Sequence, residues 1–282
     1  MQEQRDAGCA AVSMNDLYFI KLGGSVITDT EKPKTPKREE IARLLNEILS
    51  AQAENSFTVV IGHGSGSFGH SVAKQYRVQE GLCHGESKKG AAETRQVARE
   101  LNSILIETGL HYGMPLMAFS PSSFAVAKGR RLVQGTSKHI DHAISQGFIP
   151  VVYGDVVTDL DQGVSIASTE EAFRFLTQEI KPTKIVLGTD VDGVFDSDPT
   201  KNPGARLIKE VNGKNIETVL SGAAGAHKID VTGGMKTKLS ILYEMVKATG
   251  ATGYILNASK PGTVKKVLAG RENEVLCTRV VA

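Results

Sequence analysis

Short apolar runs alternate along the chain with longer stretches in which apolar residues recur at the spacing of an amphipathic helix. The runs predict buried strands, and they lie at residues 17–22, 57–61, 116–119, 149–152, 185–187 and 254–256. The helical stretches cover residues 41–49, 93–107 and 235–246. Alternation of this kind is typical of an α/β sheet protein, which is the fold class that the pattern predicts.

Weaker patterns add three expectations. Residues 122–134 lack the periodicity of a buried helix and predict a hairpin flap. The sequence Ser168-Thr169-Glu170-Glu171 is a capping box, in which Ser168 caps a helix and Glu171 reaches back to it. That helix is expected to run towards Ile180 and to stop at Pro182, and residues 196–204, with two prolines and a glycine, are expected to be loop.

The length of 282 residues suits one large domain or two abutting lobes. We predict two halves of one compact unit, 17–162 and 163–282, with the seam at the polar turn 159–163. Residues 1–16 are expected to be a disordered leader, within which Met14 is a candidate for the original start.

Composition excludes several classes of protein. The net charge of +2, the aromatic content of 5% and the absence of Trp argue against nucleic-acid binding and against binding at a membrane surface. Cys9, Cys83 and Cys277 match neither a disulfide framework nor a zinc site. No apolar run approaches the ~20 residues of a membrane span, and the first residues do not form a signal peptide. We therefore expect a cytoplasmic protein.

Three glycine clusters follow predicted strands or open predicted helices: Gly23-Gly24-Ser25, residues 62–70, and Gly233-Gly234-Met235. Without a Cβ atom, the backbone can approach phosphate oxygens and direct its N–H groups at them. A helix that follows adds the positive end of its dipole. Three such clusters together predict a site that handles phosphate groups.

The second cluster also satisfies the dinucleotide fingerprint, at residues 64–69, so a dehydrogenase is a rival interpretation. That fingerprint requires an acidic residue ~20 positions later, at the end of the next strand. Glu86 lies instead in a polar stretch, which disfavours a dehydrogenase. The chain also lacks the lysine-containing P-loop of many nucleotide-binding proteins.

Lysines accompany two of the clusters. Lys21 ends the first apolar run, and a lysine in such a run needs a partner anion. Lys236 and Lys238 begin the helix after Gly234, and because they are two residues apart they point to different faces. Lysines at these places could neutralise the charge of a phosphoryl group during its transfer.

Other polar residues complete the list of candidates. His70 closes the second glycine loop and could donate to an oxyanion, whereas His63 abuts the strand and fits a structural role. Asp155, Asp190 and Asp192 adjoin glycines or glycine loops, where aspartate also serves turn chemistry. No spacing of His, Cys or Glu indicates a metal site built by the protein.

In combination, these motifs resemble the amino acid kinase superfamily over roughly residues 17–278. The motifs are Lys-Leu-Gly-Gly-Ser, the glycine-rich second loop, Thr-Asp-Val-Asp-Gly-Val, and Asp-Val-Thr-Gly-Gly-Met-Lys-Thr-Lys. The loop from His63 to the terminal His70, together with Pro121-Ser122-Ser123-Phe124, resembles the branch that phosphorylates isopentenyl phosphate. The resemblance implies an open αβα sandwich with a mainly parallel sheet, assembled as a homodimer. It also implies acceptor binding by residues 17–162 and ATP binding by residues 163–282.

The resemblance also implies roles for single residues. Lys21 would stabilise the transferring phosphoryl group, His70 would bond the acceptor phosphate, and Lys238 would meet the ATP phosphates. On the ATP side it implies Gly24, Gly66, Asp190 and Gly234, to which we add Gly23 and Ser25. On the acceptor side it implies the Ser65 backbone, to which we add Gly64, Gly154, Asp155 and Thr169.

The implied reaction converts isopentenyl phosphate and ATP to isopentenyl diphosphate and ADP, with Mg²⁺ carried by the nucleotide phosphates. The attacking oxygen of such an acceptor is already ionised at neutral pH, which fits the absence of a convincing general base. A fosfomycin kinase, whose phosphonate acceptor needs the same anion holder, is the alternative within the superfamily. A nucleotide-binding or storage protein of this fold is the alternative that is not a kinase, and the presence of both Lys21 and Lys238 argues against it.

Two positions depart from the family pattern. Glu170 stands where the family often carries an aspartate that positions the lysines. A lysine that the family often carries after the first glycine loop has two candidates here, Lys32 and Lys34. The helix from Lys88 to Thr108 is a candidate for the floor of the acceptor pocket.

Overall fold

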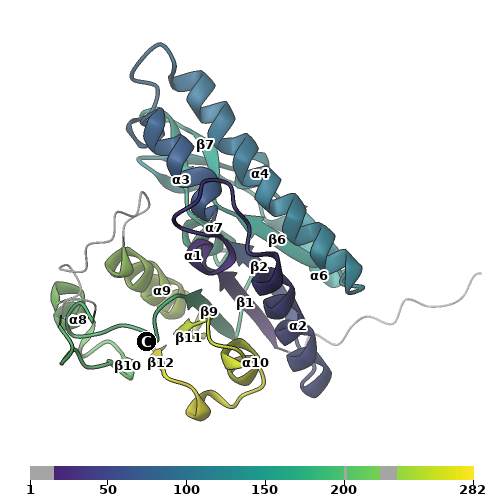
Figure 1. Cartoon of the computed structure of the whole chain (residues 1–282), viewed down its shortest axis with the longest axis vertical. Helices are drawn as coiled ribbons and strands as arrows, with labels where there is room; N and C mark the ends of the chain where they lie inside the picture. The colour runs from purple at the N-terminus through teal and green to yellow at the C-terminus, as the bar shows by residue number, and fades with distance from the viewer. Residues whose placement is uncertain (1–15, 200–201, 223–233) are drawn as a thin grey trace, which may run out of the picture.

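The computed structural model describes residues 16–199, 202–222 and 234–282. Its centre is an eight-stranded sheet in the order β10-β12-β11-β9-β1-β2-β6-β3 (Figure 1). The strands from β11 to β3 are all parallel, and β12 runs antiparallel to β11. The strands are β1 (Leu17–Leu22), β2 (Thr58–His63), β3 (Leu116–Phe119), β6 (Ile149–Tyr153), β9 (Lys184–Thr189), β10 (Glu210–Val211), β11 (Thr252–Asn257) and β12 (Cys277–Val280).

Helices cover both faces of this sheet. The α-helices are α1 (Gly24–Ile27), α2 (Arg38–Glu54), α3 (Gly66–Gln75), α4 (Ser87–His111), α5 (Pro121–Phe124), α6 (Lys138–Ser145), α7 (Thr169–Leu176), α8 (Ile216–Gly222), α9 (Met235–Thr249) and α10 (Thr263–Leu268). Two 3₁₀ turns, η1 (Val78–Glu80) and η3 (Glu272–Glu274), complete the described elements. The predicted strands and helices at the sites named above are confirmed.

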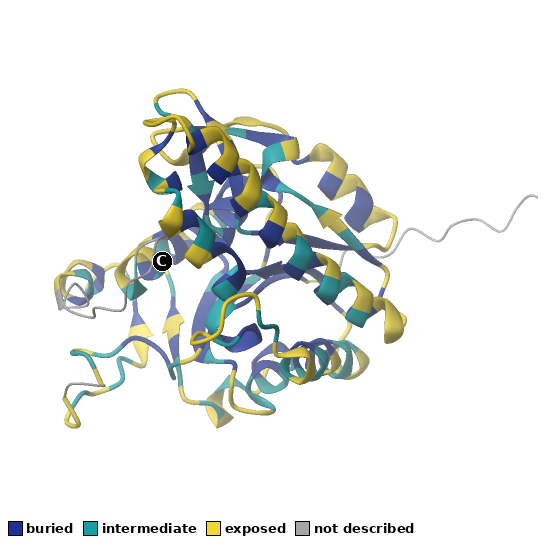
Figure 2. Cartoon of the chain, turned by 45° about the horizontal axis from the view of Figure 1, so that its top comes forward, coloured by how far each residue is buried: buried dark blue, intermediate teal, exposed yellow. Residues whose placement is uncertain are grey.

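Alternate residues of each strand enter two separate cores, as the pleat requires. In β1, Phe19 packs with α7 and α9 on one face, whereas Ile20 and Leu22 pack with α2, α4 and α10 on the other. Figure 2 shows the buried strands between helices whose outward faces are exposed. Lys21 lies two residues after Phe19 in the strand, so both side chains are on the face of the sheet that α7 covers.

A second sheet of four strands has the order β5-β4-β7-β8. Its strands are β4 (Ala125–Lys128), β5 (Arg131–Gly135), β7 (Asp155–Asp159) and β8 (Gly163–Ala167). The antiparallel pair β4–β5 confirms the hairpin that was predicted within residues 122–134. The polar turn at residues 159–163, predicted as a seam, joins β7 to β8. The division into two lobes with separate functions stays a prediction.

Only one of the two hydrogen bonds of the predicted capping box is present. Ser168 does cap α7, because its Oγ accepts the N–H of Glu171 at 3.1 Å. The Glu171 side chain does not reach back to Ser168 but bonds Arg174 and the N–H of Leu132. These buried partners, Leu132 of the hairpin and Arg174 within α7 itself, take the place of the return bond of the capping box. The helix also ends at Leu176, four residues before Ile180, because Ile180 packs into the core from a turn.

The fold class is confirmed as α/β, with a mainly parallel sheet between two helical layers. Within the described residues, no helix combines the length and the apolar composition that a membrane span needs. The predicted leader lies outside the described residues except for Asp16, as do Cys9 and Gly233.

Candidate active site

A cavity of about 620 Å³ opens at the carboxyl ends of β1, β2 and β9. In open parallel sheets, ligands bind beyond these strand ends. The described residues that were assigned to ATP or to the acceptor all line this cavity: Lys21, Gly23, Gly24, Ser25, Gly64, Ser65, Gly66, His70, Gly154, Asp155, Thr169, Asp190, Gly234 and Lys238. Asp192, a further candidate, is not in the lining and pairs with Lys260 at 2.5 Å. Residues of β1, α1, α3, β7, α7 and α9, and of the loops beside these elements and after β9, are therefore brought to one place.

The glycine loops touch one another through their backbones. A Cβ atom on Gly23 would lie 2.6 Å from the carbonyl oxygen of Gly188, at the end of β9. A Cβ atom on Gly24 would lie 2.5 Å from the nitrogen of Gly66. Gly66 also has a φ of +47°, which favours glycine. The loops form a cradle that side chains would fill, and such a cradle fits the phosphates of a nucleotide.

Lys21 forms a buried ion pair at the floor of the cavity. Its Nζ donates to Glu170 Oε1 at 2.7 Å, and Lys21 and Glu170 are 7% and 3% exposed. Burial opposes ionisation of the Glu170 carboxyl, but Lys21 and Lys238 outweigh it and lower its pKa. The predicted partner anion of Lys21 is thus Glu170, the first acidic residue of α7.

Lys238 reaches the same cavity from the first turn of α9. Gly234 is the N-cap of this helix, and both Gly234 and Lys238 line the cavity, whereas Lys236 is exposed outside it. The fifteen-residue helix directs its positive end at the cavity. Two lysines and two helix starts, those of α3 and α9, therefore make the site suited to a polyanion.

The two histidines of the second loop differ in environment. His63 is fully buried, stacks on Tyr153 and lies 3.2 Å from Asn102 Oδ1 and 3.1 Å from the Gly64 carbonyl. Burial lowers the pKa of His63, so its ring is neutral at pH 7 and serves the packing of the loop. His70, in contrast, is an exposed residue of α3 that lines the cavity.

Asp155 holds a wall of the cavity. Its Oδ2 accepts the hydroxyl of Ser120 at 2.5 Å and the N–H of Ser122 at 3.2 Å. Its Oδ1 lies 3.5 Å from Arg95 Nε on α4. The carboxylate is therefore engaged with the Pro121-Ser122 turn and α4. Asp155 therefore connects this wall of the cavity to Ser120, Ser122 and Arg95.

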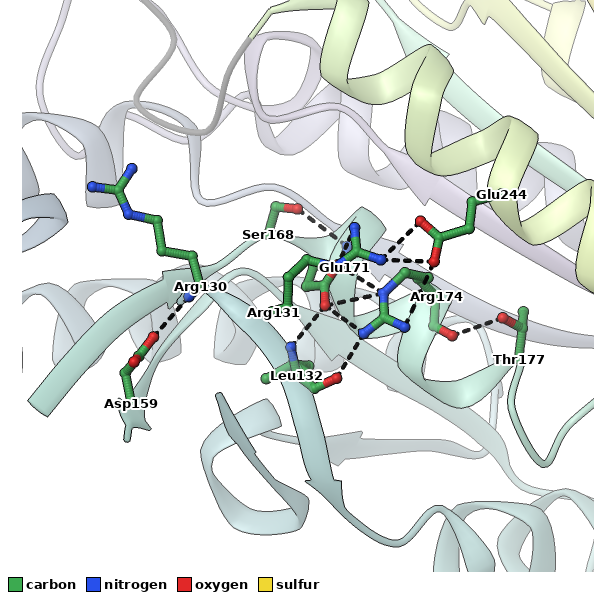
Figure 3. A network of polar contacts seen from close by, with 9 residues as sticks. All are labelled: Arg130, Arg131, Leu132, Asp159, Ser168, Glu171, Arg174, Thr177 and Glu244. Carbon is green, nitrogen blue, oxygen red and sulfur yellow. Dashed lines mark hydrogen bonds and ion pairs between the residues drawn. The ribbon is translucent and has the colours of Figure 1, made fainter. Parts of the chain in front are cut away.

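The first turn of α7 connects the site to its surroundings. Thr169 Oγ1 donates to the carbonyl of His63 at 2.6 Å, and Glu170 binds Lys21. Glu171 continues into the network of Figure 3, where it accepts the Leu132 N–H at 2.7 Å and pairs with Arg174 at 2.6 Å. Three consecutive residues thus fix α7 to the second glycine loop, to β1 and to the β4–β5 hairpin.

The same network extends from the hairpin to α9. Arg174 Nη2 donates to the Leu132 carbonyl at 2.6 Å, so both backbone groups of Leu132 are held. Arg131 makes two bonds to Glu244 of α9, at 2.7 and 2.8 Å (Figure 3). The buried Glu171–Arg174 pair and the exposed Arg131–Glu244 pair together join α7, β5 and α9.

Replacing Glu171 with glutamine is expected to lower the free energy of unfolding by about 3 kcal/mol, because Arg174 would keep a buried charge without its partner. Chemical unfolding followed by circular dichroism measures this loss. The matched control is Glu244→Gln at the exposed end of the network, where we expect a loss below about 1 kcal/mol. Equal losses in the two variants would contradict the importance of burial.

Several lining residues were not predicted from the sequence. Ala73, Thr94, Ala98, Val156 and Ile166 also line the cavity, and three of them, Ala73, Val156 and Ile166, belong to one apolar cluster. Thr94 and Ala98 lie in the helix proposed as a floor, four residues apart on one face, a spacing that could have identified them. The lining further includes Gly188, Thr189, Val191, Gly193, Phe195, Ser197, Asp198 and Pro199.

The loop after α1 departs from the expectation about its lysines. Thr30 and Glu31 line the cavity, whereas Lys34 pairs with Glu100 at 3.4 Å on the surface and Lys32 is exposed outside the lining. The tight conformation at Lys34, whose φ is +51°, directs the chain away from the cavity. Neither lysine therefore reaches the site in this structure.

The structure also bears on two other kinds of site, a metal site and the dinucleotide site of a dehydrogenase. Within residues 16–199, 202–222 and 234–282, no group of three His, Cys, Asp or Glu side chains could hold a metal ion. Glu86, the residue closest to the ribose-binding position of a dehydrogenase, precedes α4 as its N-cap and does not end a strand. The dinucleotide fingerprint at residues 64–69 therefore lacks its second requirement.

Comparisons with known proteins place this geometry in context. Residues 16–257 match the sequence model of the Amino acid kinase family. Isopentenyl phosphate kinase of Methanothermobacter thermautotrophicus is 34% identical over 264 residues, which cover 91% of this chain and 96% of that protein. The same enzyme of Methanocaldococcus jannaschii is 33% identical, covering 90% and 95%. A solved structure of isopentenyl phosphate kinase superposes with a TM-score of 0.79 at 33% identity, covering 94% of this chain and 100% of the other.

Proposed function

The chain belongs to the amino acid kinase family, and from this premise we propose that it transfers the terminal phosphate of ATP to isopentenyl phosphate. The products are isopentenyl diphosphate and ADP. The observation that carries the proposal is the lining of one cavity, which combines the cradle of glycine loops with apolar side chains of α3, α4, β7 and β8. The relatives with the same activity in their names support this choice of acceptor.

The acceptor side suits a phosphate with a short hydrocarbon tail. His70 and Ala73 lie three residues apart on α3, so the proposed phosphate holder and the wall of the tail pocket share one helix face. Ala98 of α4 and the paired residues Val156 and Ile166 enclose the rest of this pocket. Alanine side chains at 73 and 98 leave room for a small branched tail.

The nucleotide is proposed to bind between the first glycine loop, the end of β9 and the start of α9. Gly24 and Gly66 would approach its phosphates, Gly234 and Lys238 would bind them, and Asp190 would border the nucleotide. Mg²⁺ bound to the phosphates would neutralise part of their charge. The groups of the protein that would bind the nucleotide phosphates are backbone N–H groups of the glycine loops and lysine side chains. The close contacts between the loops leave no room for larger side chains in the cradle.

In the proposed reaction, an oxygen of isopentenyl phosphate forms a bond to the terminal phosphorus of ATP. The bond between that phosphorus and the bridging oxygen breaks, and ADP leaves with the electron pair. Lys21, which Glu170 holds in place, and Lys238 stabilise the charge on the transferring group. The attacking oxygen is ionised at neutral pH, so the chain needs no general base.

The experiment that tests this proposal measures ADP release from Mg-ATP in the presence of different acceptors. We expect strong turnover with isopentenyl phosphate, and weak or no turnover with glutamate. Turnover with fosfomycin alone would show that the acceptor is a phosphonate, and the proposed mechanism of phosphoryl transfer would still apply. No ADP release with any of the acceptors would favour a binding or storage protein of this fold.

Filling the apolar part of the lining is expected to weaken acceptor binding selectively. In Ala98→Leu, the larger side chain occupies space that the tail needs, so we expect the KM for isopentenyl phosphate to rise about 10-fold or more. The affinity for ATP, measured by calorimetry on the same variant, should stay unchanged and serves as the control. A parallel loss of ATP affinity would contradict the assignment of this part of the lining to the acceptor tail.

The homodimer, which the family resemblance implies, and the cytoplasmic location, which the composition suggests, remain predictions. The strand β3 lies at an edge of the large sheet, and the exposed apolar residues Leu110, Tyr112 and Phe148 adjoin this edge. These features support a subunit contact at that edge.

A further inference from the structure

Thr28 carries a buried hydroxyl that joins the first two glycine loops. The residue is 0% exposed and follows α1 as its C-cap. Its Oγ1 donates to the carbonyl of Gly24 at 2.7 Å and accepts the N–H of Ser67 at 3.0 Å. One hydroxyl therefore bonds the backbone of the proposed ATP loop and the backbone of the proposed acceptor loop.

The bond to Gly24 alone would be ordinary, since threonine in a helix often bonds the carbonyl four residues earlier. The bond from Ser67 is different, because Ser67 lies 39 residues away in sequence. Gly66 packs directly on this hydroxyl, and a Cβ atom there would lie 2.1 Å from Thr28 Oγ1. The hydroxyl is thus enclosed at the contact between the loops.

The same bond determines which donors of α3 face the cavity. Ser65 is the N-cap of α3 and makes no side-chain cap bond, so the first N–H groups of the helix need other partners. The N–H groups of Phe68 and Gly69 bond the Ser65 carbonyl, and Thr28 takes the N–H of Ser67. Ser65, which we assign to the acceptor phosphate, and Gly66, which we assign to ATP, both line the cavity.

From these contacts we infer that Thr28 is a positioning residue that sets the spacing of the two phosphate groups that react. It is not among the residues that line the cavity, and it acts through the backbones of Gly24 and Ser67. Transfer requires the reacting atoms to lie about 3–3.5 Å apart, and a misplacement of about 1 Å can cost about 100-fold in rate. The inference rests on the proposed function, because it concerns the relative position of donor and acceptor.

The test compares Thr28→Val, which keeps the shape and removes both bonds, with Thr28→Ser, which keeps the hydroxyl. We expect Thr28→Val to lower kcat about 10- to 100-fold, with both KM values within about 3-fold of the wild type. Thr28→Ser should stay within about 3-fold of the wild type. Amide hydrogen exchange of Ser67 should quicken in Thr28→Val and not in Thr28→Ser.

The matched control is Thr249→Val at the end of α9, outside the cavity lining, where the hydroxyl donates to a carbonyl four residues earlier at 2.8 Å and accepts the N–H of Ala251 at 3.1 Å. We expect this control to change kcat by less than about 2-fold. If Thr28→Val does not fold, Thr28→Cys, with a weak donor in place of the hydroxyl, is expected to lose about 10-fold in kcat.

Unchanged kcat in Thr28→Val or Thr28→Cys, with only a lower melting temperature, would overturn the inference and leave Thr28 a structural residue. The wild type, assayed in parallel with isopentenyl phosphate, separates the two claims. An active wild type with an equally active Thr28→Val contradicts the role of Thr28 alone. An inactive wild type contradicts the proposed function.

Discussion

Lys21→Met is expected to lower kcat about 1,000-fold while the enzyme still binds ATP. Lys21 is the buried cation at the floor of the cavity, and Glu170 fixes its Nζ at 2.7 Å. A cation held in this way stabilises charge that develops in the transition state without any reorganisation. Steady-state kinetics with saturating isopentenyl phosphate and ATP measure the loss.

A second variant separates catalysis from stability at this pair. Lys21→Met leaves the buried Glu170 without its principal cation, whereas the double variant with Glu170→Gln removes the stranded charge. We expect the double variant to regain much of the lost free energy of unfolding and none of the lost activity. Recovery of activity together with stability would reduce Lys21 to a structural role.

The pH dependence of stability follows from the same pair. The pKa of Glu170 is lowered in the folded protein, so this carboxylate stabilises the fold above its unfolded pKa, and the contribution is lost as the pH falls. In Lys21→Met, only one of the two lysines that lower the pKa of Glu170 remains, Lys238, so burial opposes ionisation of this carboxyl more strongly than in the wild type. The difference in the free energy of unfolding between the wild type and Lys21→Met should therefore become smaller as the pH is lowered from 8 to 5.

His70→Ala is expected to raise the KM for isopentenyl phosphate about 30-fold, with little change in the affinity for ATP. A hydrogen bond to a charged phosphate contributes about 1.5–3 kcal/mol, which corresponds to about 10- to 150-fold in binding. Because His70 is exposed, its removal should leave the melting temperature nearly unchanged. Initial rates over a range of both substrates give the two constants separately.

The matched control for this variant is His142→Ala, at an exposed histidine of α6 outside the cavity lining. We expect wild-type constants from it. A His70→Ala enzyme with unchanged acceptor KM and unchanged kcat would contradict the assigned role. A rise confined to the KM for ATP would move His70 to the nucleotide side.

Much of the fold could be predicted because the strands are buried and short and the helices are amphipathic. The run at residues 17–22 is apolar except for Lys21, and the face of α4 repeats at helical spacing. What periodicity could not reveal depends on distant partners. The Glu171 side chain turns to Arg174 and Leu132 instead of Ser168, and no local pattern specifies that choice.

The site was predictable where chemistry demands a residue type. Glycines at strand ends and a lysine inside an apolar run are visible in the sequence, and the structure gathers them around one cavity. The apolar part of the lining was less visible, because Ala73, Val156 and Ile166 resemble ordinary core residues until the cavity is seen. Glu170 lies 149 positions after its partner Lys21, so no local pattern could indicate the pair, and only the family resemblance placed an acidic residue near the lysines at this position.

The measurement that tests the central claim most directly is ³¹P NMR of the protein with Mg-ATP and isopentenyl phosphate. We predict that the monophosphate resonance disappears while two coupled resonances of a diphosphate ester appear, together with ADP in equal amount. ADP with free inorganic phosphate and an unchanged isopentenyl phosphate resonance would contradict the proposed transfer.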